Sequence, residues 1–189
     1  MGSIEPKLFV ISGPSGAGKG TLVARVREQY PNLGLTVSAT TRAPRDGEVE
    51  GVNYYFLSDE EFSQRVDAGE FIEWAQVHDH RYGTLASEVD RNLATGRSLI
   101  LEIDVQGALA VKRRFPHAVL IFIEPPSLEV LRERLVGRGS ETEESLSLRL
   151  ADAEHEMQLV SEYDEVVVND DLDEATAELL AVLTRYERN

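Results

Sequence analysis

The chain has no cysteine among its 189 residues, and this absence excludes several classes of protein. Disulfide scaffolds, iron–sulfur proteins, cysteine-ligated zinc sites and thiol catalysts all need that side chain. Long apolar runs are also missing, since the longest, 118–123, is far too short to cross a bilayer. The first residues contain no long apolar segment, and Pro6 stands where a myristoylation signal needs serine or threonine. We therefore expect a cytoplasmic protein without membrane contact.

Positive charge is also scarce. The 34 acidic residues outnumber the 19 basic ones and give a net charge of −15, which argues against a nucleic-acid-binding surface. Only three of the basic residues are lysines, so 16 are arginines. Because the guanidinium group is a planar fork of N–H donors that matches phosphate oxygens, arginines clustered in an acidic chain favour specific anion binding.

The pattern of apolar segments indicates the fold class. The length and the 42% hydrophobic content suit one domain with a sizeable core. Strands and helices alternate, which predicts an α/β fold with a mostly parallel central sheet flanked by helices. The expected strands are 8–12, 98–103, 118–123 and 165–168, and the expected helices are 21–30, 87–95, 105–115, 127–138, 143–161 and one from 171 onward.

Residues 35–84 interrupt this alternation with short β-like pieces, and we interpret them as a small inserted subdomain. Ser58 and Glu61 form a capping box that predicts the start of a helix inside it. The expected pieces are a weak strand at 35–38, a loop at 39–53, strands at 54–57 and 71–77, and a helix over 58–68.

The strongest chemical signal lies between the first strand and the first helix. It reads Gly13-Pro14-Ser15-Gly16-Ala17-Gly18-Lys19-Gly20-Thr21. Glycines let backbone N–H groups point inward around phosphate oxygens, and a helix N-terminus adds partial positive charge. Lys19 would reach the β- and γ-phosphates of a nucleotide, whereas a turn that only caps a helix does not require a lysine. The segment therefore predicts a phosphate-binding P-loop.

One position departs from the usual P-loop pattern, which has serine or threonine directly after the lysine. Here that residue is Gly20, and Thr21 comes one position later. Because the usual hydroxyl binds Mg²⁺ directly, the metal is expected to be held by nucleotide phosphates and water.

Two further clusters allow two interpretations each. Arg42 and Arg45 lie three residues apart in the 39–53 loop, with Tyr54 close behind, so they would converge on one phosphate or form a solvated polar loop.

Glu102 and Asp104 are expected on one face at the carboxyl end of a strand, where open α/β sheets bind ligands. Plain exposure explains Glu102 equally well.

Together these segments resemble the guanylate kinases, a family of nucleoside monophosphate kinases. The resemblance covers nearly the whole chain, from Val10 to about Leu180. The blocks that carry it are 12–16, 38–48, 71–75, 82–84, 104–108, 137–142 and 168–171. Only Lys19-Gly20-Thr21 is closer to the adenylate kinases. The resemblance implies a P-loop kinase fold that transfers the γ-phosphoryl group of ATP to GMP, with Mg²⁺ as the cofactor.

The resemblance also implies a role for individual residues on the GMP side. Those that read the guanine are Ser38, Glu73, Thr84 and Asp104. A carboxylate accepts both the N1–H and the N2 amine of guanine, whereas adenine presents a lone pair at N1. Those that bind the GMP phosphate are Arg42, Arg45, Tyr54 and Tyr82.

On the ATP side the implied ligands are residues 13–21 together with Arg134, Asn169 and Asp170. The implied catalytic residues are Lys19, Arg42, Arg138 and Arg149, and Glu102 is implied to hold Mg²⁺ through water. The expected subdivision is a core (1–34, 85–129 and 151–189), a GMP-binding subdomain (35–84) and a helical lid (130–150).

Two other functions remain open at this point. Another small-molecule phosphotransferase of similar fold would keep the P-loop, although Ser38 and Glu73 favour guanine. A non-catalytic guanylate-kinase-like domain that binds proteins would typically lose the P-loop glycines or Lys19, which are present here. ATP and GMP are the expected partners, with dGMP as an open alternative, and both a monomer and a small homo-oligomer are compatible with the sequence.

Overall fold

Strand β1 (Leu8–Ser12) is an apolar run whose five residues are all buried at the centre of a five-stranded sheet. The computed structural model describes residues 6–77, 79–137 and 143–188. The strands lie in the order β2 (Gly34–Leu35), β7 (Leu99–Glu102), β1, β8 (Val119–Glu124) and β9 (Glu165–Val168). All four neighbouring pairs run parallel, which confirms the expected α/β architecture.

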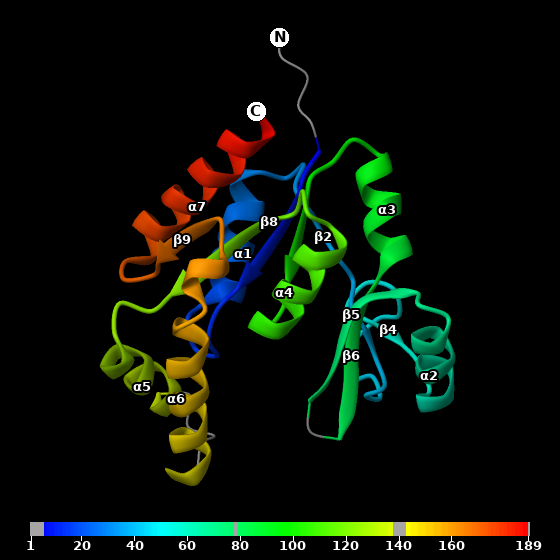
Figure 1. Ribbon diagram of the computed structural model, residues 1–189, viewed down its shortest axis with the longest axis horizontal. Helices are drawn as coiled ribbons and strands as arrows, with labels where there is room; N and C mark the ends of the chain where they lie inside the picture. Colours follow the sequence, from blue (N-terminus) through cyan, green and yellow to red (C-terminus); the bar gives the residue numbers. More distant parts are fainter. Residues whose placement is uncertain (1–5, 78, 138–142, 189) are drawn as a thin grey trace.

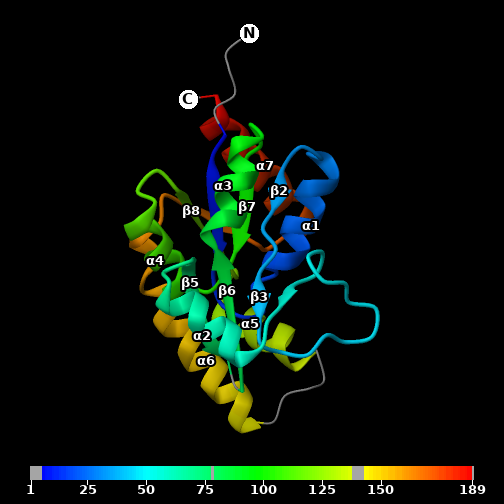
Figure 2. The same ribbon diagram turned by 90° about the vertical axis from the view of Figure 1, so that its right-hand side faces the viewer.

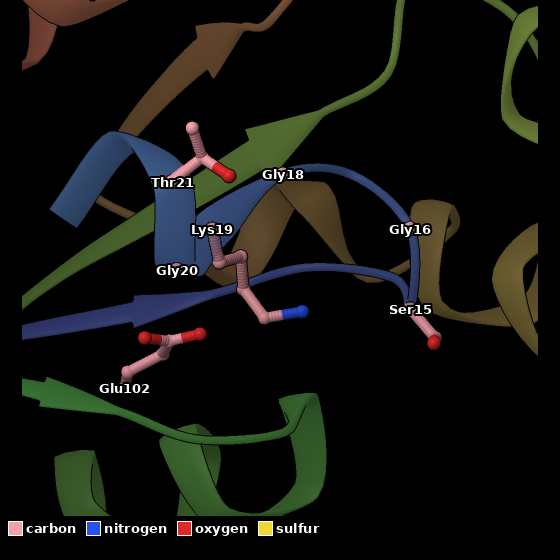
Figure 3. Close-up of a pocket in the computed structure, with 7 residues that line it drawn as sticks. All are labelled: Ser15, Gly16, Gly18, Lys19, Gly20, Thr21 and Glu102. Carbon is pink, nitrogen blue, oxygen red and sulfur yellow. The ribbon is translucent and has the colours of Figure 1, made fainter. Parts of the chain in front are cut away.

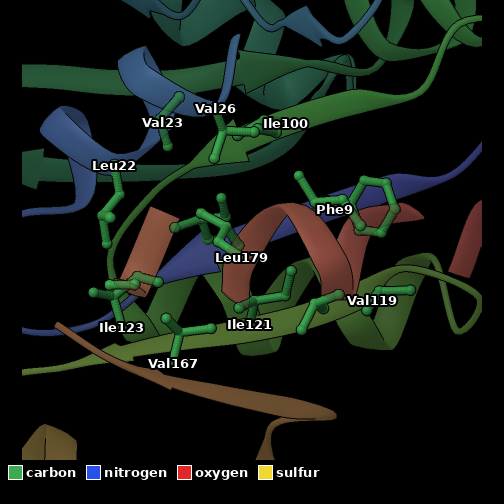
Figure 4. Packing of buried hydrophobic residues seen from close by; sticks show 14 of the residues in the cluster. Phe9, Leu22, Val23, Val26, Ile100, Val119, Ile121, Ile123, Val167 and Leu179 are labelled. Carbon is green, nitrogen blue, oxygen red and sulfur yellow. The ribbon is translucent and has the colours of Figure 1, made fainter. Parts of the chain in front are cut away.

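Alternation along β1 gives the sheet two apolar faces. Phe9 and Ile11 belong to the cluster beneath helices α1 (Lys19–Gln29) and α7 (Leu172–Glu187), which Figure 4 shows. The expected apolar face of α7 lies in or against this cluster: Leu172, Ala175, Leu179, Leu183 and Tyr186. Leu8 and Val10 belong to the cluster on the other face, beneath α3 (Ala86–Ala94) and α4 (Val105–Arg114).

A second, four-stranded sheet lies beside the carboxyl edge of the first (Figure 1). Its strands are β4 (Tyr55–Phe56), β3 (Ala39–Thr40), β6 (His80–Leu85) and β5 (Phe71–Val77), in that order. Helix α2 (Asp59–Asp67) covers it with the buried ring of Phe62, and the expected capping box of Ser58 and Glu61 is present. Figure 2 shows the loop between β3 and β4 projecting from this sheet.

Helices α5 (Leu128–Val136) and α6 (Glu143–Met157) pack on each other on the opposite side of the molecule from the second sheet (Figure 1). Leu131, Leu135 and Leu146 form the apolar contact between them. A short 3₁₀ turn, η1 (Val160–Glu162), then leads into β9. No helix within the described ranges is long and apolar enough to cross a membrane.

Four expected elements differ in the structure. Of the strand expected at 35–38 only Leu35 lies in a strand, because the chain leaves the central sheet there and enters the second sheet at Ala39, so the loop expected at 39–53 begins as β3. Strand β6 was missed, because His80 to Gly83 lack an apolar alternation and take their conformation from pairing with β5. The helix expected to reach 161 ends at Met157. The helix expected to reach 138 ends at Val136, and position 138 lies outside the described residues.

The assigned core predicts that truncating a buried apolar side chain lowers the free energy of unfolding much more than truncating an exposed one. Ile121→Ala, on a fully buried strand, should lower the free energy of unfolding by about 2–5 kcal/mol because it leaves a cavity. Val49→Ala is the control, since Val49 is 54% exposed and its truncation should cost less than about 0.5 kcal/mol. Urea unfolding of both variants measures the difference, and equal losses would contradict the assigned core.

Candidate active site

The carboxyl edge of the central sheet collects most of the polar residues that the sequence singled out. The P-loop follows β1, Glu102 ends β7, and Asn169 and Asp170 follow β9. Because the strands are parallel, their carboxyl ends meet at one edge, which is where open α/β sheets bind ligands. Three cavities have a wall at this edge.

The P-loop has a backbone that leaves donors free for an anion. At Gly13, with φ of 137°, a Cβ atom would lie 2.2 Å from the carbonyl oxygen of Ile123, so only glycine fits. Helix α1 begins at Lys19 behind Gly18, which has no side chain to cap the first N–H groups. Those groups and the positive end of the helix dipole therefore face the first cavity. Its volume is about 210 Å³, and its lining is Ser15, Gly16, Gly18, Lys19, Gly20, Thr21 and Glu102 (Figure 3).

Lys19 and Glu102 extend into this cavity from opposite walls (Figure 3). The Lys19 ammonium donates to the carbonyl oxygens of Gly13, at 2.5 Å, and Pro14, at 3.1 Å. Burial raises the pKa of the Glu102 carboxyl, while the charge of Lys19 opposes that rise. The cavity thus holds a fixed cation beside a carboxylate that loses its proton less readily than usual.

The residue after the lysine faces Glu102. A Cβ atom on Gly20 would lie 3.6 and 3.8 Å from the two carboxylate oxygens of Glu102. Figure 3 shows Thr21 on the opposite side of Lys19 from Glu102, with its hydroxyl directed toward the Gly18 side of the loop. The later hydroxyl therefore does not replace the one that the usual P-loop pattern supplies.

The second cavity, of about 430 Å³, lies between β5 and the start of α4. Its lining is Phe71, Ile72, Glu73, Trp74, Ala75, Asp104, Gln106, Gly107, Ala110 and Arg113. A Cβ atom on Gly107 would lie 3.1 Å from Asp104 Oδ1 and 3.2 Å from Glu73 Oε2, so both carboxylates converge on this glycine. Asp104 Oδ1 also accepts the N–H of Gly107 at 2.6 Å and caps α4. Since β7 ends at Glu102, the two expected acids, Glu102 and Asp104, line different cavities.

Glu73 is the most perturbed acid of the site. Burial raises the pKa of its carboxyl to about 7, and the neighbouring Asp104 carboxylate adds to the rise, while Thr84 opposes it. Thr84 lies opposite Glu73 in the β5–β6 pair, and its side chain is fully buried. These groups form a poorly hydrated polar surface with unused hydrogen-bonding capacity.

Arg42, Tyr54 and Tyr82 come together beside the second sheet. The Arg42 guanidinium lies 5.4 Å from the Tyr54 ring centre, and the Tyr54 and Tyr82 rings are 6.1 Å apart. Arg42 Nη2 also donates to both carboxylate oxygens of Glu48, at 2.8 and 2.9 Å. The Arg42 guanidinium and the N–H of Arg45 hold the pKa of Glu48 below its usual range. Glu48 stands in the same sequence block as the arginines, but nothing in its spacing singled it out.

The third cavity, of about 420 Å³, lies on the far side of the P-loop. It is lined by Gly16, Gly18, Thr21, Arg134, Gly137, Asn169, Asp170 and Leu172. Asn169 Nδ2 donates to the carbonyl oxygen of Ala17 at 2.7 Å, and Arg134 Nη2 donates to the backbone oxygen of Asn169 at 2.8 Å. Arg134 Nη1 is buried without a partner among the described residues. One wall of this cavity is therefore hydrogen-bonded to the P-loop.

The remaining expected residues are less connected. Arg149 Nη1 donates to Ser15 Oγ at 3.2 Å, so α6 touches the P-loop. The side chains of Ser38 and Arg45 make no hydrogen bond within the described ranges, and Arg45 is exposed. Arg138 lies outside the described residues.

The described residues contain no large cluster of metal ligands. Within the described ranges, no group of three or more histidine and carboxylate side chains lies close enough together to hold a metal ion. Mg²⁺ prefers oxygen ligands and keeps several waters, so a single carboxylate beside a phosphate-binding loop fits it. Glu102 meets that description, and Gly20 leaves the space beside its carboxylate free of a side chain.

Comparison with known proteins finds one family across nearly the whole chain. The guanylate kinase family model matches residues 5–186. A guanylate kinase of Caldanaerobacter subterraneus subsp. tengcongensis is 50% identical over 186 residues, which cover 96% of this chain and 90% of the relative. A guanylate kinase of Synechocystis sp. is 48% identical, and the matched region covers 98% of this chain and 97% of the relative. The crystal structure of guanylate kinase from Anaplasma phagocytophilum superposes with a TM-score of 0.76 at 34% identity, covering 100% of this chain and 89% of that one.

The raised pKa of Glu73 predicts a pH-dependent effect on stability. Glu73→Gln should raise the free energy of unfolding at pH 8 by up to about 3 kcal/mol, because it removes a buried charge whose pKa is about 7 instead of 4.5. The folded state binds this proton more tightly than the unfolded state, so wild-type stability falls between pH 4.5 and 7.

Urea unfolding between pH 4 and 8 measures this gain, which should vanish near the acid end of the range. Glu178→Gln, which changes an exposed glutamate on α7, is the matched control and should show no such trend. A gain for Glu73→Gln that is the same at every pH would contradict the assignment.

Proposed function

Since the chain belongs to the guanylate kinase family and transfers the γ-phosphoryl group of ATP to GMP, giving ADP and GDP, we propose how its residues divide this reaction. The observation that carries the assignment is the convergence of Glu73 and Asp104 on Gly107 beside the second cavity. Guanine has two N–H donors on one edge, and carboxylates accept both. This chemistry is that of purine nucleotide recycling.

The second cavity is proposed to bind the guanine base. Glu73 accepts the N1–H and N2 amine, while Asp104 and the Thr84 hydroxyl complete the contacts along the base. Ser38, which directly precedes β3, donates its hydroxyl to the O6 atom. Adenine presents a lone pair at N1 toward Glu73, and a buried mismatch of this kind discriminates between bases by roughly 10⁴-fold.

The phosphate of GMP is proposed to bind at Arg42, Arg45, Tyr54 and Tyr82. Arg42 is already oriented there by Glu48 and by the Tyr54 ring. Arg45, whose side chain is exposed, turns toward the phosphate from the same loop. Either GMP or dGMP meets these contacts, since none of them involves the ribose 2′-hydroxyl.

ATP is proposed to place its phosphates in the P-loop, residues 13–21, and its adenosine in the third cavity. Arg134, Asn169 and Asp170 line that cavity. Because Asn169 is bonded to Ala17, the adenosine pocket and the phosphate loop form one connected surface.

The transfer brings two anions together, and positive charge from the protein offsets their repulsion. The transition state is loose, so positioning and electrostatic stabilisation do most of the catalysis. Lys19 and Arg42 supply charge from the two sides of the transferred group, and Arg149 reaches it from α6 beside Ser15. Arg138, whose role rests on the sequence, is proposed to act with them.

Mg²⁺ is the proposed cofactor, and when bound with ATP it neutralises phosphate charge. Glu102 is proposed to hold it through water, because its carboxylate stands beside Lys19 with open space at Gly20. This arrangement needs no hydroxyl directly after the lysine.

We also propose the subdivision of the chain into a core, a GMP-binding part at about 35–84 and a lid at about 130–150. The second sheet and the α5–α6 pair support this, since they lie on opposite sides of the P-loop (Figure 1). Closure of both parts over the substrates excludes water, which would otherwise accept the phosphoryl group.

The function is tested by a coupled ADP-release assay with GMP, AMP, CMP and UMP as acceptors. GMP should be strongly preferred, because it alone presents two N–H donors to Glu73. A protein that releases ADP equally fast with another acceptor would overturn the base assignment.

Glu73→Gln should lower kcat/KM for GMP by roughly 30- to 1,000-fold, the equivalent of about 2–4 kcal/mol for a lost charge-assisted contact and an unsatisfied donor. KM for ATP should change little, and activity on AMP should rise relative to GMP. In the wild type, KM for GMP should increase as the pH falls below about 7, because the protonated carboxyl accepts only one donor. Steady-state kinetics with both acceptors measure these effects, and equal GMP efficiency would show that Glu73 does not read the base.

Lys19→Ala should lower kcat by at least about 10²-fold because it removes a fixed charge from the transferred phosphates, while the fold is retained. Thr21→Ala is the comparison variant from the same turn. It should cost less than Lys19→Ala, because the Thr21 hydroxyl is uncharged and lies on the opposite side of Lys19 from Glu102. Single-turnover rates and thermal unfolding of both variants separate the effects, and equal losses would contradict the proposed roles.

A further inference from the structure

Glu88 is a buried carboxylate that the proposed reaction does not use. It lies in the first turn of α3 and is only 5% exposed. Its Oε2 accepts the Tyr55 hydroxyl at 3.0 Å and Arg91 Nη2 at 2.7 Å, and its Oε1 accepts Asn92 Nδ2 at 3.1 Å. Arg91 and Asn92 belong to the same helix as Glu88, whereas Tyr55 belongs to strand β4. Only the Tyr55 contact therefore joins two separate elements.

Tyr55 stands between two parts of the proposed GMP site. Its backbone N–H donates to the carbonyl oxygen of Ser38 at 2.9 Å. Its neighbour Tyr54 extends from the opposite face of the strand and lies against Arg42. A displacement of Tyr55 would thus move Ser38, the proposed guanine ligand, together with Tyr54 and Arg42, the proposed phosphate ligands.

Apart from the packing of Tyr55 against the cluster of Ala39, Phe62, Phe71 and Leu85, strand β4 is held mainly by backbone contacts. It contains two residues and lies at the edge of the second sheet, paired only with the equally short β3. A strand of this length makes few ladder hydrogen bonds, so a side-chain contact to a firm element has a large effect on its placement.

Helix α3 supplies that firm element. It begins directly after β6 without a loop, and Val89, the residue after Glu88, is fully buried against Leu99 and Leu101 of the central sheet. Figures 1 and 2 both show α3 above the second sheet and alongside the central one. The Tyr55–Glu88 hydrogen bond therefore connects the edge of the second sheet to the core.

We propose that Tyr55 and Glu88 are positioning residues for GMP. Their hydrogen bond holds β4 where Ser38, Tyr54 and Arg42 meet the nucleotide at the same time. Neither residue touches substrate, and the proposal rests on the GMP site described above. Without the bond, GMP binding must first order β4, so affinity for GMP falls while the ATP side is unaffected.

Tyr55→Phe removes only the hydroxyl, and Glu88→Met removes both acceptor oxygens from an unbranched side chain of similar length. Each should raise KM and Kd for GMP by about 3- to 10-fold, part of the strength of one hydrogen bond to a charged group. KM for ATP and kcat should both stay within about twofold, because the loss affects GMP binding. The double variant should match the single ones, because both remove the same bond. If Glu88→Met does not fold, Tyr55→Phe decides alone.

Tyr30→Phe is a control with the same chemistry elsewhere. The Tyr30 hydroxyl donates to Glu187 Oε2 at 2.7 Å, and Glu187 is 4% exposed, but this pair joins α1 and α7. The Tyr30→Phe variant should have a lower melting temperature and an unchanged KM for GMP.

Two results would overturn the proposal. One is an unchanged KM for GMP in Tyr55→Phe, and the other is an equal rise in KM for both substrates, which indicates general loosening. The wild-type acceptor panel and Tyr54→Phe test the reaction and the GMP site separately. If wild type does not phosphorylate GMP, or if Tyr54→Phe has no effect, the proposed function or site fails rather than the role of Tyr55.

Discussion

Two carbonyl oxygens, of Gly13 and Pro14, hold the Lys19 ammonium across the P-loop, and the rest of the site is arranged around that contact. It fixes a positive charge beside the uncapped start of α1, where negative phosphate oxygens are stabilised. The loop reaches this shape because Gly13 packs against the backbone of Ile123, a contact that no side chain would allow. Strand β8 therefore supports the loop as directly as β1, from which the loop emerges.

The surroundings of several acidic residues near this centre disfavour their ionised forms. Burial raises the pKa values of Glu73, Glu102 and Glu156, and nearby carboxylates add to the effect at Glu73 and Glu156. A fold selected for stability alone would not bury so many acids together. In the proposed function, two of them are stabilised by groups that arrive with the substrates, Glu73 by an N–H edge and Glu102 by a hydrated cation. The open site is thus less stable than it would be with neutral residues.

The sequence predicted the central sheet well, because its strands are continuous apolar runs bounded by glycines and polar residues. Strands β1 and β9 of this sheet match their expected ranges, as does β5 of the second sheet. The short strands β2 and β3 and the polar β6 could not be predicted, since their conformation comes from partners distant in the sequence. Thr40, for example, pairs with Tyr82 of β6.

The candidate site likewise contains residues that local sequence patterns predicted and residues that they did not. The P-loop is local, so spacing and flanking elements were enough to identify it. The two-carboxylate surface at Gly107 needs Glu73, 34 positions away, to be brought onto α4, which no local pattern reveals. Family resemblance supplied Glu73, but it assigned no role to Glu48 or Glu88. Those two act through other side chains, and only coordinates show which ones they contact.

The hydrogen bond between Asn169 and Ala17 has a consequence for the order of folding. It joins residues 152 positions apart, and Asn169 Nδ2 fills the space that a Cβ atom on Gly18 would occupy. A ribosome makes the P-loop early in synthesis, yet the support for that loop emerges much later. A nascent chain that lacks β9 therefore carries the complete phosphate-binding sequence without the wall that shapes it. The final shape of the loop thus depends on the folding of a segment that is made long after it.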